Sequence, residues 1–219
     1  MYANTIEALT VIIILIFSLV LHEIAHARIA FYLGDPTAKN MGRFSFNPLK
    51  HMSYMSLVLP LALFLIQAPM LSFAKPVLYN ESAFKNPKRD IIFVSLAGPF
   101  VNLVLAIIAF IFYNKLSILP DSIFLYCNQF LLAMFTINVT LCAFNLLPIP
   151  PLDGSALYMS SIINHSRNLA TKFNDYGLGV LIALLIIVPM IAGEKYNFVM
   201  IYLNYCYSKL ITMLTFLGL

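Results

Sequence analysis

Two histidines four residues apart, with a glutamate directly after the first, carry the most specific chemistry in this sequence. They are His22, Glu23 and His26, in the run His-Glu-Ile-Ala-His. On a helix, residues i and i+4 lie on one face, so both imidazoles can reach one metal ion. Glu23 can then act on a water molecule held by that metal, because zinc lowers the pKa of a bound water to about 7. The pattern predicts a metal site with a general base beside it.

The pattern follows a long apolar run. About 14 uncharged residues, from Ala8 to Leu21, precede His22, which corresponds to roughly 21 Å of helix at about 1.5 Å per residue. Against a hydrocarbon core about 30 Å thick, this predicts a site below the cytoplasmic surface and inside the bilayer. The alternative is that neighbouring helices satisfy these polar side chains without a metal. We favour metal binding, because ionisable groups inside a membrane usually mark a functional site.

A catalytic zinc site normally takes three protein ligands and leaves one position open. Asp153 is the candidate for the third ligand, because it ends a proline-rich run that directly follows an apolar segment. Three prolines there prevent a regular helix and predict extended backbone. Non-helical backbone at membrane depth is tolerated only where it lines a cavity or is buried in protein. The alternative is an ordinary proline-rich exit loop. The remaining acids lie in loops, at segment ends or, for Glu7, about four helical turns before His22.

Composition predicts an all-α polytopic membrane protein. Of the 219 residues, 61% are hydrophobic and only 10% are charged, too few charges to cover the surface of a soluble domain. No basic stripe with interleaved aromatic residues is present, so no nucleic-acid partner is expected. Six apolar segments are long enough to cross a bilayer: Ile6–Phe31, Met55–Ala74, Ile91–Tyr113, Ile123–Leu147, Tyr176–Ala192 and Phe198–Leu217.

The number of crossings depends on the second apolar segment. His22 and Asp153 can meet on one side of the membrane only if Met55–Ala74 re-enters instead of crossing. Pro60, Gln67 and Pro69 interrupt this segment and would break a straight helix. We therefore expect five or six transmembrane helices, with a re-entrant segment and a proline-broken helix at the active site.

Charge provides a second argument for the re-entrant segment. With it, 11 of the 13 basic residues fall on one face, and only Lys115 and Lys195 fall on the other. The positive-inside rule makes the charged face cytoplasmic. The prediction is a multi-pass protein of the cell inner (cytoplasmic) membrane, with its N-terminus outside and its C-terminus in the cytoplasm. Reporter fusions at Asn80 and Asp121 test this topology, because they should report opposite sides.

These motifs together resemble the site-2 protease family, the M50 intramembrane zinc metalloproteases. The first motif is His-Glu-x-x-His, and the second, Asn-x-x-Pro-x-Pro-x-Leu-Asp-Gly, is complete from Asn145 to Gly154. The resemblance is to the compact bacterial branch without a PDZ or CBS domain, and it covers about residues 15–158. It extends to four further segments: Gly34–Ala38, Asn47–His51, Ala74–Val77 and Ala97–Asn102. One departure follows His51, where Met52 begins a run that replaces the Asp-Pro of the branch.

The resemblance implies roles for individual residues. His22, His26 and Asp153 would bind one Zn2+ per chain, Glu23 would be the general base, and Asn145 would bind the substrate strand or stabilise the oxyanion. The substrates would be transmembrane or membrane-anchored proteins, and regulation would come from a membrane partner or from the loops. Asn102, in the middle of an apolar span, can either hydrogen-bond across helices or face the site and bind substrate.

The sequence thus predicts one integral-membrane metalloprotease domain over residues 1–219. Its catalytic core would span about residues 6–158, and residues 173–219 would add C-terminal helices. A membrane zinc protease that trims prenylated or unfolded proteins is an alternative, but such enzymes take a glutamate from a later helix as third ligand. A metal transporter or an inactive scaffold is the other alternative. A transporter needs polar residues along its path, and a scaffold would usually have lost Glu23 or a ligand.

Overall fold

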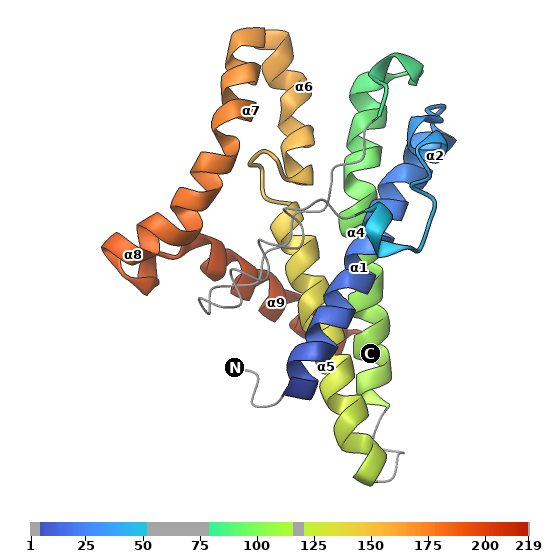
Figure 1. Ribbon diagram of the computed structural model, residues 1–219. Coiled ribbons are helices and arrows are strands. Elements are labelled where there is room, and N and C mark those ends of the chain that lie inside the picture. Colours follow the sequence, from blue (N-terminus) through green and yellow to red (C-terminus); the bar gives the residue numbers. More distant parts are fainter. Residues whose placement is uncertain (1–4, 52–78, 116–120, 219) are drawn as a thin grey trace. The chain divides into compact units, whose positions relative to one another are not determined.

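The computed structural model describes residues 5–51, 79–115 and 121–218, and these residues are helical with connecting turns (Figure 1). The predicted re-entrant segment Met55–Ala74 lies outside the described residues. The chain divides into two compact units, one formed by residues 15–101 and the other by residues 1–14 and 102–219. Two long helices, α1 (Thr5–Tyr32) and α4 (Pro87–Asn114), contribute to both units.

The first unit is built where α1 and the beginning of α4 pack together. Ala30 of α1 and Val94 of α4 are buried with Phe84, which ends the short helix η2 (Glu81–Ala83). Small residues such as Ala27 and Ala30 let neighbouring elements approach α1 closely. The 3-10 helix η1 (Pro48–Lys50) and the helix α2 (Thr37–Asn40) complete this unit.

The end of α1 is fixed by a glycine and a buried carboxylate. Gly34 adopts a positive φ of 111°, and the N–H of Asp35 donates to the carbonyl of Ala30. This is the Schellman arrangement, in which glycine avoids the strain of left-handed backbone. The Asp35 carboxylate then accepts hydrogen bonds from the N–H and hydroxyl of Thr37 and from the N–H of Asn80. Asp35 therefore ties the end of α1 to the segment that leads into α4.

The second unit packs α4, α5 (Asp121–Asn145) and α9 (Phe198–Phe216) together. The buried cluster contains two alanines and Phe110 of α4, together with larger side chains of α5 and α9 such as Phe135 and Leu214. The remaining helices form a separate run in which α6 (Ala156–His165) packs against α7 (Arg167–Ile182). A π-helical turn, η5 (Ala183–Ile187), leads into α8 (Val188–Ala192), and the short η6 (Glu194–Tyr196) precedes α9.

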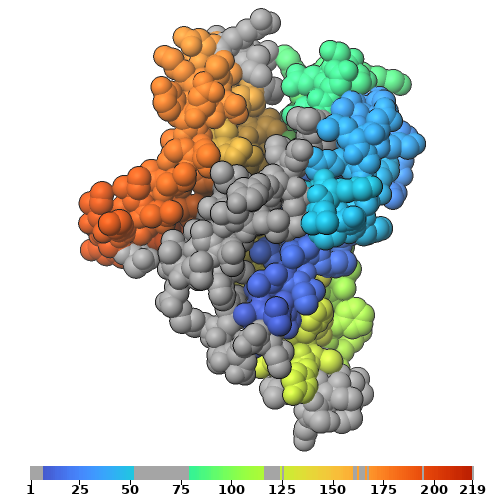
Figure 2. Space-filling view, viewed as in Figure 1, coloured from blue at the N-terminus to red at the C-terminus, as the bar shows by residue number. Residues whose placement is uncertain are grey.

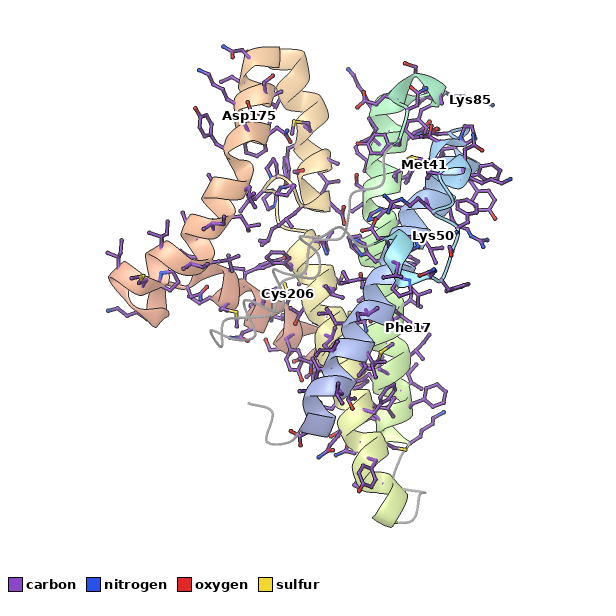
Figure 3. The ribbon with its side chains drawn as sticks, in the orientation of Figure 1. Phe17, Met41, Lys50, Lys85, Asp175 and Cys206 are labelled. Atoms are coloured by element: carbon purple, nitrogen blue, oxygen red, sulfur yellow. The ribbon has the colours of Figure 1, made fainter. Side chains whose placement is uncertain are left out.

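Within the described residues, four helical segments have the length and apolar composition of a membrane crossing: Glu7–Tyr32, Pro87–Asn114, Tyr126–Asn145 and Asn168–Ala192. The all-helical membrane fold is therefore confirmed, whereas the predicted five or six crossings are not. Helix α9 is absent from these four; its central turns carry Asn204, Ser208 and Lys209, which lower its hydropathy. Large apolar side chains such as Phe17 lie exposed on the long helices (Figure 3), as a lipid-facing surface requires.

Candidate metal centre

The three residues of the first motif lie together on α1 and are shielded from solvent. His22, Glu23 and His26 are 4%, 5% and 6% exposed. The two Nε2 atoms are 2.9 Å apart, as expected for side chains one turn apart on one face of a helix. The imidazole rings meet edge to face, with their centroids 4.6 Å apart. Both rings therefore direct one nitrogen toward the same point.

A backbone carbonyl of α4 sets the tautomer of His26. The Nδ1 atom of His26 lies 2.6 Å from the carbonyl oxygen of Val94. A carbonyl oxygen can only accept, so Nδ1 carries the proton and Nε2 keeps its lone pair. Metal-binding histidines are commonly held by such a hydrogen bond to their second nitrogen. With His22 Nε2 beside it, this lone pair suits a divalent cation that prefers imidazole ligands, and the pair fits zinc.

Gly98 of α4 provides the space that the two rings occupy. A Cβ atom at this position would lie closer than 3.0 Å to His26 Nε2 and to His22 Cε1 and Nε2. Pro99 follows inside the helix and cannot donate to the carbonyl four residues earlier. Gly98 thus makes room for the two histidine rings.

Asp153 belongs to the second compact unit, where it begins the 3-10 helix η4 (Asp153–Ser155). The preceding run from Leu146 to Leu152 is not extended as expected but forms consecutive turns. The N–H of Ile149 donates to Leu147, and that of Leu152 donates to Ile149. Prolines fix φ near −65°, which suits turns as well as extended backbone. The prediction that Asp153 completes the ligand set stays a prediction.

Two glycines allow close packing around the run that leads to Asp153. Gly154 packs against the carbonyls of Leu146 and Leu147, and Gly177 of α7 packs against Pro150; a Cβ at either glycine would lie closer than 3.0 Å to these atoms. Helix α7 therefore braces the run before Asp153, although the sequence suggested only additional helices there. Nothing in the spacing of the sequence pairs Gly177 with Pro150, because the contact depends on how α7 folds back.

Asn102 and Asn145, the two predicted substrate-binding residues, both form side-chain hydrogen bonds within the second compact unit. The Nδ2 of Asn102 donates to Oδ1 of Asn138 at 2.9 Å, and both side chains are fully buried. This bond is the cross-helix arrangement considered for Asn102. The Nδ2 of Asn145 donates to the carbonyl of Leu141 on its own helix at 3.0 Å. A role for either residue in substrate binding stays a prediction. Sequence reasoning did not single out Val94, because a backbone carbonyl leaves no side-chain signal.

Comparison with known proteins assigns this constellation to a family. The pattern of Peptidase family M50 matches residues 10–124 and 120–188. The chain belongs to peptidase family M50. It is 35% identical over 181 residues to YwhC of Bacillus subtilis, a protein provisionally named a zinc metalloprotease, covering 80% of this chain and 79% of the relative. No solved structure matches the M50 chain.

Two mycobacterial relatives, both called Rip2, are also provisionally named zinc metalloproteases. The M50 chain is 28% identical over 203 residues to Rip2 of Mycolicibacterium smegmatis, covering 93% of this chain and 75% of the relative. It is 30% identical over 176 residues to Rip2 of Mycobacterium tuberculosis H37Rv, covering 80% and 66%. Together with its apolar helices, membership of the family makes this chain a membrane metalloprotease by descent.

Proposed function

We propose that this chain is an intramembrane zinc endopeptidase that hydrolyses peptide bonds of transmembrane or membrane-anchored protein substrates. The observation that carries the proposal is the histidine pair. Its two Nε2 atoms converge at 2.9 Å on a helix long and apolar enough to cross a membrane. The alternative functions, a metal transporter or an inactive scaffold, would not require the glutamate placed directly after His22.

The proposed ligand set is His22, His26 and Asp153, holding one Zn2+ per chain. Bound there, zinc would supply a Lewis acid that polarises the scissile carbonyl and makes water a stronger nucleophile at neutral pH. Glu23 removes the proton of the attacking water and returns it to the departing amide nitrogen, as a general base and then a general acid. The Asn145 amide, after exchanging its bond to Leu141 for the substrate, would donate to the developing oxyanion.

A substrate helix must unwind before it can react, since its carbonyls are engaged in internal hydrogen bonds. Strand addition would hold such an unwound segment through its backbone. The stretches Gly42–Pro48 and Asn145–Leu152 are the two candidates for that role, and local hydrogen bonds engage part of the backbone of each. The same proposal includes regulation by a membrane partner and a topology with the N-terminus outside. The reporter fusions at Asn80 and Asp121 test this topology.

Replacing Asp153 by alanine tests the ligand set. Purified Asp153→Ala is expected to lose most of the zinc that wild type carries at one ion per chain, because two imidazoles alone hold zinc far more weakly than three ligands. The measurement is the zinc content of folded, monodisperse protein by elemental analysis. The matched control is Asp175→Asn, which changes an exposed acid of α7 and should leave zinc unchanged. Metal-free wild type would overturn the proposal, and full zinc occupancy in Asp153→Ala would remove Asp153 from the ligand set.

A further inference from the structure

Arg43 is a buried cation with one unsatisfied nitrogen among the residues that the structure describes. Its side chain is 4% exposed, and its Nη1 has no hydrogen-bond partner among the residues that the structure describes. The sequence contains no acid between Asp35 and Glu81. Asp35 is used by Thr37 and Asn80. A guanidinium held away from water with an unsatisfied N–H is unfavourable, so this position favours an anion that the described residues do not supply.

The neighbouring basic side chains differ from Arg43 because each has a partner or is open to solvent. Arg28 lies 5.2 Å from the ring centre of Phe44, and Lys39 lies 4.4 Å from that of Phe31. These are ordinary cation–π contacts. Arg43 therefore stands out within the basic segment that follows α1.

His51 presents a second unsatisfied nitrogen in the same segment. The ring is 2% exposed, its Nε2 donates to the carbonyl of Ser45 at 2.5 Å, and its Nδ1 has no partner among the described residues. Burial lowers the pKa of His51, against the raising effect of the Ser45 carbonyl, and the charges of Arg43 and Lys50 lower it further. The imidazole is thus neutral at neutral pH. With Nε2–H given to Ser45, Nδ1 is a lone pair that needs a hydrogen-bond donor.

Lys50 is the third residue of a basic group that also contains Arg43 and His51. Its Nζ lies 3.6 Å from the position of a Cβ at Gly42, directly before Arg43, and its side chain is exposed. Gly42 has a positive φ of 72°, which favours glycine at this turn. The group therefore offers two cations to an anion and one lone pair to a donor. A ligand that satisfies both must carry an anionic oxygen and a hydroxyl close together.

The location of this segment indicates where such a ligand comes from. The candidate span of α1 ends at Tyr32, so the segment Thr37–His51 begins within a few residues of the bilayer surface. Met41, Phe46 and Leu49 expose 47%, 70% and 74% of their side chains. In Figure 2 this segment, light blue to cyan, forms an outward surface, and Figure 3 marks Met41 and Lys50 on it. Exposed apolar side chains between cations are typical of a segment seated among lipid headgroups.

We propose that Arg43, His51 and Lys50 form a binding site for an anionic phospholipid whose headgroup carries a free hydroxyl, as phosphatidylglycerol does. Arg43 and Lys50 bind the phosphodiester oxygens, and the headgroup hydroxyl donates to His51 Nδ1. Phe46 and Leu49 lie among the acyl chains. Phe44 packs with Ala27 and Ala38, so the bound lipid fixes this segment against α1 directly beyond the histidine pair.

The test compares phosphatidylglycerol with phosphatidylethanol, which has the same phosphodiester charge but lacks the hydroxyl. Full-length protein is titrated with each lipid in mild detergent, with phosphatidylcholine as the zwitterionic reference, and bound lipid is counted by native mass spectrometry. Wild type is expected to bind phosphatidylglycerol about tenfold more tightly than phosphatidylethanol, as one charge-assisted site with one further hydrogen bond allows. Equal binding of the two lipids by wild type would overturn the proposal without any variant.

The variants separate the two halves of the site. Arg43→Gln is expected to lose both anionic lipids, and His51→Phe is expected to bind both equally, whereas His51→Gln, which keeps an acceptor, should restore part of the preference. The control Lys85→Gln changes an exposed cation after η2 (Figure 3) and should bind as wild type does. If Arg43→Gln bound as much anionic lipid as Lys85→Gln, the proposed site would be overturned. Displacement of phosphatidylglycerol by equimolar inorganic phosphate, or by a peptide carboxylate, would assign the anion to another source and equally overturn it.

Discussion

Replacing Gly98 by alanine is expected to remove most of the bound zinc. The added Cβ would lie closer than 3.0 Å to ring atoms of both His22 and His26, and backbone of α4 cannot retreat without losing its packing on α1. The rings must rotate away, which also breaks the bond from His26 to the Val94 carbonyl. We expect zinc affinity to fall at least about tenfold, the range reported for lost support of a metal ligand. Competition with a chromophoric chelator measures it.

Gly179→Ala is the matched control for this experiment. Gly179 lies in α7, and a Cβ there meets nothing within 4 Å. Alanine favours helix over glycine, so this variant should fold at least as well as wild type and bind zinc equally. If Gly98→Ala also bound zinc as tightly as wild type, contact with α4 would not position the two histidine rings. The proposed role of Gly98 in the metal site would then be wrong.

Glu23→Gln is expected to keep its zinc and lose its catalysis. Glutamine has nearly the same shape, so the histidines and their bond to α4 stay in place, but a neutral amide cannot accept the proton of the attacking water. Removal of a general base typically lowers the rate by about 10²–10⁴-fold. The measurement is kcat on a transmembrane peptide, together with zinc content. Glu7→Gln, at the start of the same helix, should leave both unchanged.

The sequence predicted those parts of the molecule that follow from local pattern. The apolar run that ends at Phe31 forms α1, and the i and i+4 spacing of His22 and His26 brings their Nε2 atoms together. Helix periodicity and hydropathy suffice for such features. The three prolines before Asp153 did end a helix, but they produced turns in place of extended backbone, because local N–H to carbonyl bonds were available.

The features that sequence reasoning missed depend on contacts between elements far apart in the chain. The carbonyl of Val94 orients His26 across 68 residues, and no residue type signals a backbone acceptor. Gly177 and Pro150 meet only because α7 folds back. Arg43 was counted as one of many basic residues, and only its burial in the folded protein distinguishes it. Asn102 could be placed by sequence on an apolar helix, but its partner Asn138 could not.

The position of the cut in a substrate tests the central claim most directly. Purified enzyme and a single-pass membrane protein are placed in the same lipid vesicles, and the products are sequenced by mass spectrometry, with Glu23→Gln as the parallel sample. The account predicts a cut between residues of the apolar span, made by wild type and absent with Glu23→Gln. Cuts confined to the soluble flanks, or the same products from Glu23→Gln, would contradict an intramembrane zinc protease acting through this glutamate.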